Sequence, residues 1–211
     1  MTVVNILFDQ SQIFWQKQKM AKTIQKRTLK TRAQLIAAAK EIISQNGFEA
    51  MRVEEVVLRA GTAKGTFFAH FKDKDALMDL IIGEKINEYL DQMEIQTSPK
   101  TSSQMVKTLM PLCEFMTCER YVFDIILRYS GATRIEEIGI IATTFGRQIE
   151  IFKIWLESIE FRKDIEADIV AEGIHAFMIQ TMALKFCALH NSKSINDRLG
   201  PYLKAWLSPE C

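Results

Sequence analysis

The sequence predicts an all-α protein with two parts, a small N-terminal head of short helices and a larger C-terminal helical bundle. Apolar residues recur at helical spacing from residue 31 onward, and signals for β-strands are nearly absent. The polar stretch 96–103 contains Pro99, cannot continue a helix and marks a boundary. With 48% hydrophobic and 25% charged residues, the 211-residue chain can bury a substantial core.

Positive charge is concentrated in the first part of the chain. Residues 1–75 carry 13 Lys and Arg against 7 Asp and Glu, whereas the remaining residues carry 14 against 19. The formal net charge of the whole chain is only +1. A basic head on an acidic body predicts that a polyanion binds the head alone.

A first helix of the head is predicted over residues 32–45. Thr31 to Gln34 has the form of a capping box, and the apolar residues that follow repeat at helical spacing. Gly47 supplies a left-handed residue that ends the helix. Residues 1–30, ahead of this helix, show no clear pattern and are expected to form a variable, basic arm that is disordered in part.

Two short helices, expected over 53–60 and 63–70, are joined by a tight turn at Gly61, where a residue without Cβ can take a positive φ. Apolar residues fall where they can pack this pair together and against the first helix. The opposite side of the second helix carries small and polar residues with one lysine, which suits the major groove of DNA. The residues predicted on this side are Thr62, Ala63, Lys64, Thr66, Phe68 and His70.

Residues 31–78, from TRAQLIAAAKEIISQNGFEAMRVEEV to LRAGTAKGTFFAHFKDKDALM, resemble the DNA-binding head of the tetracycline-repressor-like (TetR) family of regulators. The resemblance implies a helix-turn-helix DNA-binding domain over 31–75. It further implies an effector-binding and dimerisation domain over 76–211, built as a helical bundle, with a connecting helix over 74–94.

The resemblance also implies roles for individual residues of the head. Charged side chains at the starts of helices would contact phosphates, and Lys64 and Thr66 would reach base edges. Lys26, Arg27 and Lys30, just ahead of the first helix, would add salt-dependent affinity without sequence information. The implied DNA-binding residues are Arg32, Arg52, Thr62, Ala63, Lys64, Gly65, Thr66, Phe68, His70 and Lys74.

Three positions depart from the family pattern. Ala63 begins the recognition helix where Ser or Asp is usual, so Thr62 is expected to cap the helix one residue earlier. Phe68 stands where Tyr is usual, which removes a hydroxyl that meets a phosphate. Arg52 stands where Ser or Thr is usual and replaces a hydrogen bond with a charged one. These departures preserve the motif and leave the operator sequence open.

The second domain is expected to contain helices over 104–117, 120–129, 135–160, 165–190 and 201–207. Its aromatic and sulphur side chains can build an ordinary core, and together they also offer adaptable walls for an apolar or aromatic effector. A proline inside the first of these helices kinks it and leaves room for a cavity. The candidate effector-binding residues are Met105, Leu109, Met116, Phe123, Phe145, Phe152, Trp155, Phe177 and Met178.

The helix over 165–190 carries apolar residues on more than one face and needs cover on both sides. Its own domain covers one face, and a two-fold partner is the simplest cover for the other. We therefore expect a homodimer through this helix and the helix over 201–207, which Pro201 begins. His175 and His190 are interpreted as satisfied structural residues. The terminal helix would contribute Tyr202, Leu203, Trp206 and Leu207.

The sequence gives no signal for an enzyme, a metal protein or a membrane protein. The four cysteines form no CxxC pair and have no histidine at metal-ligand spacing, so reduced thiols and no bound metal are expected. No Ser-His-Asp pattern or phosphate-binding loop indicates catalysis, and no cofactor is expected. The longest apolar run, Ile174 to Leu184, is too short to span a bilayer. We expect a soluble, cytoplasmic protein.

The predicted function is that of a ligand-responsive transcriptional regulator. We expect a dimer to bind a pseudo-palindromic DNA operator and repress by occupancy, and a small effector to release it. The alternative is a helical dimeric interaction module that has lost sequence-specific DNA binding, which Ala63 and Phe68 support. Replacing Lys64 and Thr66 distinguishes the two, because only the regulator would lose operator binding.

Overall fold

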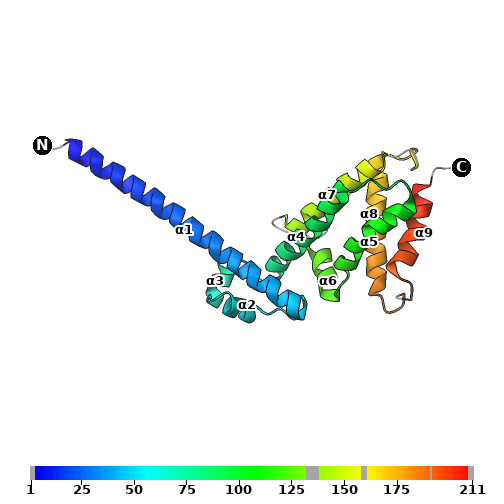
Figure 1. Cartoon of the computed structure of the whole chain (residues 1–211), viewed down its shortest axis with the longest axis horizontal. Helices are drawn as coiled ribbons and strands as arrows, with labels where there is room; N and C mark the ends of the chain where they lie inside the picture. The colour runs from blue at the N-terminus through cyan, green and yellow to red at the C-terminus, as the bar shows by residue number, and fades with distance from the viewer. Residues whose placement is uncertain (1–2, 132–137, 158–160, 191, 209–211) are drawn as a thin grey trace. The chain divides into compact units, whose positions relative to one another are not determined.

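The protein is all-helical, as the sequence predicts (Figure 1). Helices follow one another from α1 to α9, and the described residues contain no strand. The chain divides into two compact units, Met1–Lys74 and Asp75–Cys211. The computed structural model describes residues 3–131, 138–157, 161–190 and 192–208, with side chains from residue 25 onward.

Helix α1 spans Val3–Asn46 and is much longer than the helix predicted over 32–45. The structure gives residues 3–30 a helical backbone, and disorder of part of this arm stays a prediction. No Gly or Pro occurs before Gly47, so nothing in the sequence interrupts the helical hydrogen bonds. The capping box at Thr31 lies inside the helix, where backbone N–H groups already have helical partners. The end of α1 is as predicted, because Gly47 has φ 87°.

Helices α2 (Val53–Arg59) and α3 (Lys64–Phe68) form the predicted helix-turn-helix pair, with α2 beside α1 (Figure 1). Gly61 has φ 64°, as the predicted turn requires, and the next N–H, of Thr62, donates to the Val57 carbonyl at 2.9 Å. Both helices are too short to be stable alone, so a shared core must hold them. That core consists of Leu35, Ala38, Ala39, Ile42, Met51, Val56, Val57, Phe67 and Phe71, all at most 8% exposed.

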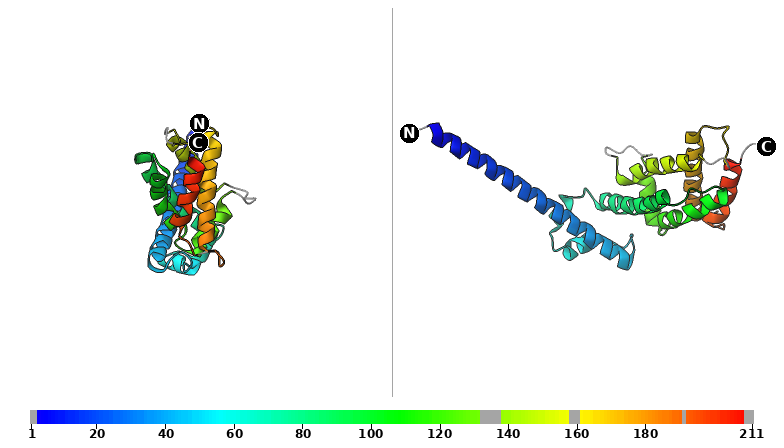
Figure 2. Two further views of the ribbon diagram at one scale, coloured as in Figure 1. Left: turned by 90° about the vertical axis from the view of Figure 1, so that its right-hand side faces the viewer. Right: turned by 45° about the horizontal axis from the view of Figure 1, so that its top comes forward.

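The second unit is a helical bundle. Figure 2 shows α8 and α9 running side by side, α5 packs on both of them, and α7 packs on α8. None of the helices in the described part of the chain combines the length and apolar character that crossing a bilayer requires. The bounds are α4 (Lys74–Ile95), α5 (Ser102–Met116), α6 (Arg120–Tyr129), α7 (Ile140–Trp155), α8 (Ala167–Lys185) and α9 (Ile195–Leu207).

Helix α9 begins earlier than predicted. The hydroxyl of Ser194 accepts a hydrogen bond from the Asp197 N–H at 3.1 Å, so Ser194 caps the helix. Pro201 therefore does not begin the helix but lies inside it. The serine cap outweighs the preference of proline for the first helical position because it satisfies an N–H group that has no partner within the helix.

Helix α9 also packs more deeply into its own unit than predicted. Leu203 and Leu207, expected to meet a partner chain, are 0% and 1% exposed because α9 contacts α5 and α8. The indole N–H of Trp206 donates to the Val170 carbonyl at 3.0 Å. Of the four α9 residues predicted to contribute to the interface, only Tyr202 and Trp206 keep partial exposure.

Two other helices differ in length from the prediction. Helix α8 ends at Lys185 rather than at residue 190, so His190 lies in a turn beyond it. Helix α7 is shorter than the predicted range 135–160, of which residues 135–137 and 158–160 lie outside the described residues.

A buried carboxylate joins α4 to α7. Asp79 of α4 is 8% exposed, and its two oxygens accept hydrogen bonds from the backbone N–H groups of Ile140 and Ile141, each at 3.1 Å. These N–H groups belong to the first turn of α7 and have no partner within that helix. Asp79 therefore caps α7 from a different helix, and its charge lies at the positive end of the α7 dipole.

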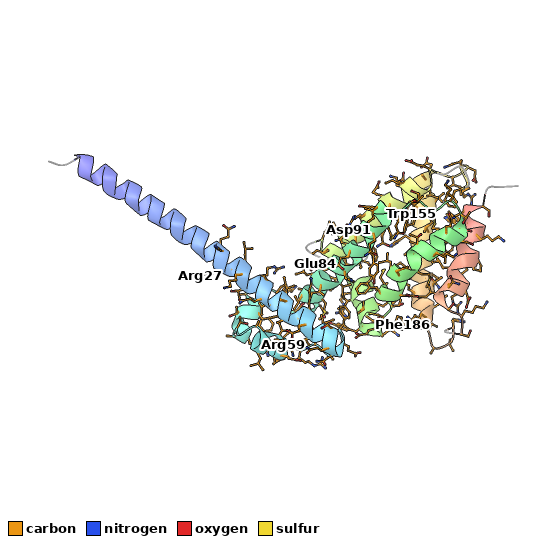
Figure 3. The ribbon with its side chains drawn as sticks, in the orientation of Figure 1. Arg27, Arg59, Glu84, Asp91, Trp155 and Phe186 are labelled. Carbon is orange, nitrogen blue, oxygen red and sulfur yellow. The ribbon has the colours of Figure 1, made fainter. Side chains whose placement is uncertain are left out.

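A second polar contact joins the same two helices farther along. Arg147 of α7 donates to Asp91 at 2.6 Å, to Glu94 at 2.8 Å and to the side chain of Asn87 at 2.9 Å. Asp91 is visible on α4 in Figure 3 and is 67% exposed. Solvent screens this network, so we expect it to stabilise the bundle less than the buried Asp79 contact does.

Replacing Asp79 with Asn is expected to lower the free energy of unfolding by about 1–3 kcal/mol, because an amide nitrogen cannot accept a hydrogen bond and a buried N–H of α7 loses its partner. Urea unfolding followed by circular dichroism measures this. Asp168→Asn is the matched control, since the Asp168 side chain is 61% exposed and its loss should cost less than about 0.5 kcal/mol. Equal effects of the two substitutions would contradict the capping role.

Candidate DNA-binding interface

The recognition helix α3 is anchored by two aromatic rings and one arginine. Phe67 and Phe71 are 0% and 4% exposed, with ring centroids 5.5 Å apart. Arg32 of α1 donates to the His70 carbonyl at 2.9 Å, and its guanidinium carbon lies 4.3 Å from the centroid of the Phe71 ring. Arg32 thus fixes the C-terminal end of α3 to α1, while its contact with a DNA phosphate stays a prediction.

One side of α3 carries the residues that the sequence predicts to face DNA, and we call it the α3 surface. Phe68 lies on it and is 49% exposed. Ala63 is the N-cap and makes no side-chain hydrogen bond. The expectation that Thr62 caps the helix is wrong, because its hydroxyl is buried without a hydrogen-bond partner among the described residues. The α3 surface comprises Thr62, Ala63, Lys64, Gly65, Thr66, Phe68 and His70, all exposed or partly exposed.

Lys64 forms an ion pair with Glu54 of α2. The Nζ and Oε1 atoms are 2.6 Å apart, and the two side chains are 57% and 65% exposed. The hydrogen bond from Lys64 holds the pKa of the Glu54 carboxyl below its ordinary value. Exposed ion pairs add little net stability, so a base edge or a phosphate can replace Glu54 as the partner of Lys64.

Arg52 and Lys74 converge on one backbone oxygen. A guanidinium nitrogen of Arg52 donates to the Glu49 carbonyl at 2.8 Å, and Nζ of Lys74 donates to the same oxygen at 3.0 Å. Two cations that share an acceptor are close neighbours and repel each other, so an anion beside them is favoured. The structure thus brings together two residues for which the sequence separately predicts phosphate contacts.

The basic residues ahead of residue 31 lie on α1. Lys26, Arg27 and Lys30 are exposed on this helix, and Figure 3 shows Arg27 projecting from it. On α2, Arg59 lies near the C-terminal part of α1 (Figure 3) and pairs with Glu41 at 3.4 Å. Arg59 is therefore occupied in joining two helices of the head.

The predicted effector-binding residues lie mostly in the core of the second unit. Phe145 and Phe177 are half-buried, and their rings contact His175 and Tyr202 with centroids 4.6 Å and 5.2 Å apart. Trp155, labelled in Figure 3, packs on Phe152. The structure shows packing for these side chains, and their contact with an effector stays a prediction. Those at most 2% exposed are Met105, Leu109, Met116, Phe123, Phe152, Trp155 and Met178.

Sequence reasoning missed several polar residues that the fold makes important. Glu54 and Asp79 act through partners distant in the sequence, which no local pattern reveals. Gln148 falls on the apolar stripe of α7, a signal that could have identified it, and both of its side-chain polar atoms are buried without a partner. His175 is not satisfied as expected, because its buried Nε2 has no partner among the described residues. Burial lowers the pKa of His175 to about 4.

The geometry of α1 to α3 defines a helix-turn-helix DNA-binding head, and comparison with known proteins agrees. The family model described as "Bacterial regulatory proteins, tetR family" matches residues 35–81. YvdT of Bacillus subtilis strain 168, an uncharacterized HTH-type transcriptional regulator, is 30% identical over 142 residues, which cover 67% of this chain and 71% of YvdT. The chain belongs to the tetR family of bacterial regulatory proteins and is a DNA-binding transcriptional regulator, as the resemblance implied.

Solved structures share the fold at low sequence identity. FadR from Bacillus subtilis, solved with stearoyl-CoA, has a TM-score of 0.59 at 18% identity, covering 83% of this chain and 97% of FadR. RolR, solved with resorcinol, has a TM-score of 0.59 at 16% identity, covering 88% of this chain and 91% of RolR. These similarities establish the fold and leave the ligand of this protein to be argued from its own residues.

Replacing Arg32 with Ala is expected to weaken DNA binding and to lower the free energy of unfolding by about 1–2 kcal/mol, because α3 loses a charged hydrogen bond and a cation–π contact. Chemical denaturation measures the second effect. Lys30→Ala is the control on the same helix, since Lys30 is exposed and should change stability by less than about 0.5 kcal/mol. If both variants unfold alike, Arg32 does not anchor α3.

Proposed function

We propose that this protein is a cytoplasmic repressor that binds a pseudo-palindromic operator as a homodimer and leaves it when a small apolar or aromatic effector binds. The observation that carries the proposal is the α3 surface, on which Lys64 and Thr66 are at least partly exposed, together with the neighbouring cations Arg52 and Lys74 of the same unit. A short helix with readable polar groups and flanking cations suits the major groove and its phosphate walls.

We assign the base contacts and the phosphate contacts to different residues. Lys64 and Thr66 read base edges, whereas Arg52 and Lys74 bind a phosphate and set the register of the head. Gly65 has no atom within 4 Å of the place where a Cβ would stand, so DNA can approach the backbone there. Phe68 offers an apolar ring where a thymine methyl group can pack.

The effector is proposed to bind in the second unit among the aromatic and sulphur side chains named above. FadR and RolR, which share the fold, were solved with stearoyl-CoA and resorcinol, so this architecture holds ligands of very different size. In this chain the candidate residues are packed together, and methionines such as Met105 and Met178 can change conformation at low cost. An effector would therefore enter by changing the conformations of methionine side chains such as these.

The homodimer is proposed to form through α8 and α9. Ile169, Ala176 and Ala183 recur every seven residues on α8 and are exposed or half-buried, with Ile169 48% exposed. On α9, Tyr202 and Ala205 also retain exposure. A stripe of small and apolar side chains on two neighbouring helices suits the self-complementary contact of a two-fold dimer.

Helix α4 is proposed to carry the signal between effector and DNA. It begins at Lys74, whose Nζ bonds the Glu49 carbonyl, and its next residue, Asp75, accepts a hydrogen bond from Tyr121 at 3.1 Å. Because Asp79 also caps α7, an effector that displaces α7 would pull on α4 and change the spacing of the two heads. This requires the effector to bind the two states with different affinity.

Replacing Glu54 with Gln is expected to strengthen DNA binding about 3- to 10-fold, because Lys64 is released and a negative charge leaves the α3 surface. Lys64→Gln should weaken binding about tenfold or more. Fluorescence anisotropy at several salt concentrations measures both, using a DNA fragment that the wild-type protein selects from genomic DNA.

Glu88→Gln is the matched control for this experiment, because Glu88 forms the same kind of exposed pair with Lys85 at 2.6 Å in the second unit. It should leave DNA affinity unchanged. Neutral behaviour of Glu54→Gln and Lys64→Gln together would favour the interaction module over the repressor.

Replacing Ala176 with Arg is expected to convert the dimer to a monomer, since a charged side chain at the centre of the proposed interface would be desolvated without a partner. Sedimentation velocity measures the change. Ala37→Arg introduces the same charge at an exposed position of α1 and should remain dimeric. Dimers in both variants would exclude this surface as the interface.

A further inference from the structure

Most of the buried polar side chains described in the second unit have hydrogen-bond partners, and one does not. The hydroxyls of Thr117, Thr144 and Thr181 donate to the carbonyls of Cys113, Ile141 and Met178 at 2.7, 2.7 and 2.9 Å. The carboxylate of Asp79 accepts two backbone hydrogen bonds. Gln148, which is 0% exposed, is the exception.

Neither polar atom of the Gln148 amide has a hydrogen-bond partner among the described residues. This holds for Oε1 and Nε2 alike. Gln148 lies on the buried side of α7, one turn before Phe152 and two turns before Trp155. A leucine would fill similar space without an unpaired donor and acceptor, so packing gives no reason for an amide here.

A second unpaired polar atom lies on the helix packed against α7. Nε2 of His175, on α8, is buried without a partner among the described residues. Its ring lies edge-on to that of Phe145, with centroids 4.6 Å apart, and Phe145 precedes Gln148 by one helical turn. Burial holds the pKa of His175 to about 4, so the imidazole is neutral near pH 7.

The charge of the surroundings restricts what these groups can bind. No Lys or Arg is among the buried residues that the structure describes, and the buried carboxylate of Asp79 is already paired with α7. Arg147, next to Gln148 in the sequence, is held by Asp91 and Glu94. A carboxylate or phosphate brought to Gln148 would have no countercharge, whereas a neutral group would need none.

We infer that Gln148, with His175 as its neighbour across the α7–α8 contact, is the polar anchor of the effector site and takes a neutral molecule with an adjacent hydrogen-bond donor and acceptor, such as a carboxamide. The amide of Gln148 gives one hydrogen bond to this group and receives one from it. The apolar remainder of the molecule packs on Phe152 and Trp155. The inference rests on the proposed function and specifies the chemistry of its effector.

Three probes of similar size test this inference, namely benzamide, benzoate and ethylbenzene. Their affinity for the full-length protein is measured by ligand-observed NMR for the wild type, Gln148→Leu and the control Gln92→Leu, in which an exposed glutamine of α4 is changed in the same way. The wild type and Gln92→Leu should bind benzamide most tightly. Gln148→Leu should lose about tenfold for benzamide and nothing for ethylbenzene.

Thermal unfolding without a probe supplies a second readout. Gln148→Leu should raise the melting temperature by roughly 2–4 °C, because an unpaired buried amide is removed, whereas Gln92→Leu should not. A lower melting temperature for Gln148→Leu would overturn the inference. So would the absence of benzamide binding to the wild type, or benzoate binding as tight as that of benzamide.

DNA binding by the same proteins separates this inference from the proposed function. Gln148→Leu should bind the selected DNA fragment as tightly as the wild type, because Gln148 is buried in the second unit and is not among the residues proposed to contact DNA. If the wild type binds DNA and shows no preference for benzamide, only the effector chemistry is wrong. If the wild type selects no DNA, the proposed function itself fails.

Discussion

The anchoring of α3 by Arg32 and the two phenylalanines is the constraint on which the DNA-binding head depends. A helix of five residues has no stability of its own, so its place is set entirely by what its inner side contacts. Phe67 and Phe71 supply the apolar contact, and Arg32 ties the segment that directly follows α3 to α1. The outer side is then free to carry the residues that are proposed to contact DNA. Lys64 and Phe68 are both exposed there.

In the second unit, two polar contacts of different strength join α4 to α7. Asp79 of α4 accepts hydrogen bonds from two backbone N–H groups in the first turn of α7. The two helices are therefore joined by directional hydrogen bonds and by the attraction between the carboxylate and the α7 dipole. The Arg147 network lies in solvent and is weaker. The contact between α4 and α7 is thus buried at Asp79 and exposed at Arg147, which suits the transmission of effector binding through α4 proposed above.

The unpaired buried polar atoms of Gln148 and His175 are consistent with an effector site in the second unit. The buried threonines of this unit satisfy their hydroxyls through backbone carbonyls one turn away, which the Gln148 amide and the Nε2 atom of His175 do not do. Functional sites commonly retain residues that reduce stability in the absence of a ligand. The amide of Gln148 has the character of such a residue.

The sequence alone determined the helical class, the turn at Gly61, the end of α1 at Gly47 and the outward side of α3, because these depend on spacing and backbone conformation within a few residues. It did not determine where α1 and α9 begin. The capping box at Thr31 and the proline at 201 are local preferences, and an uninterrupted helix and the Ser194 cap overrode them. Only the tertiary structure decided that Glu54 pairs with Lys64, that Arg52 meets Lys74 and that Asp79 caps α7, since these contacts join residues whose separation along the chain carries no periodic signal.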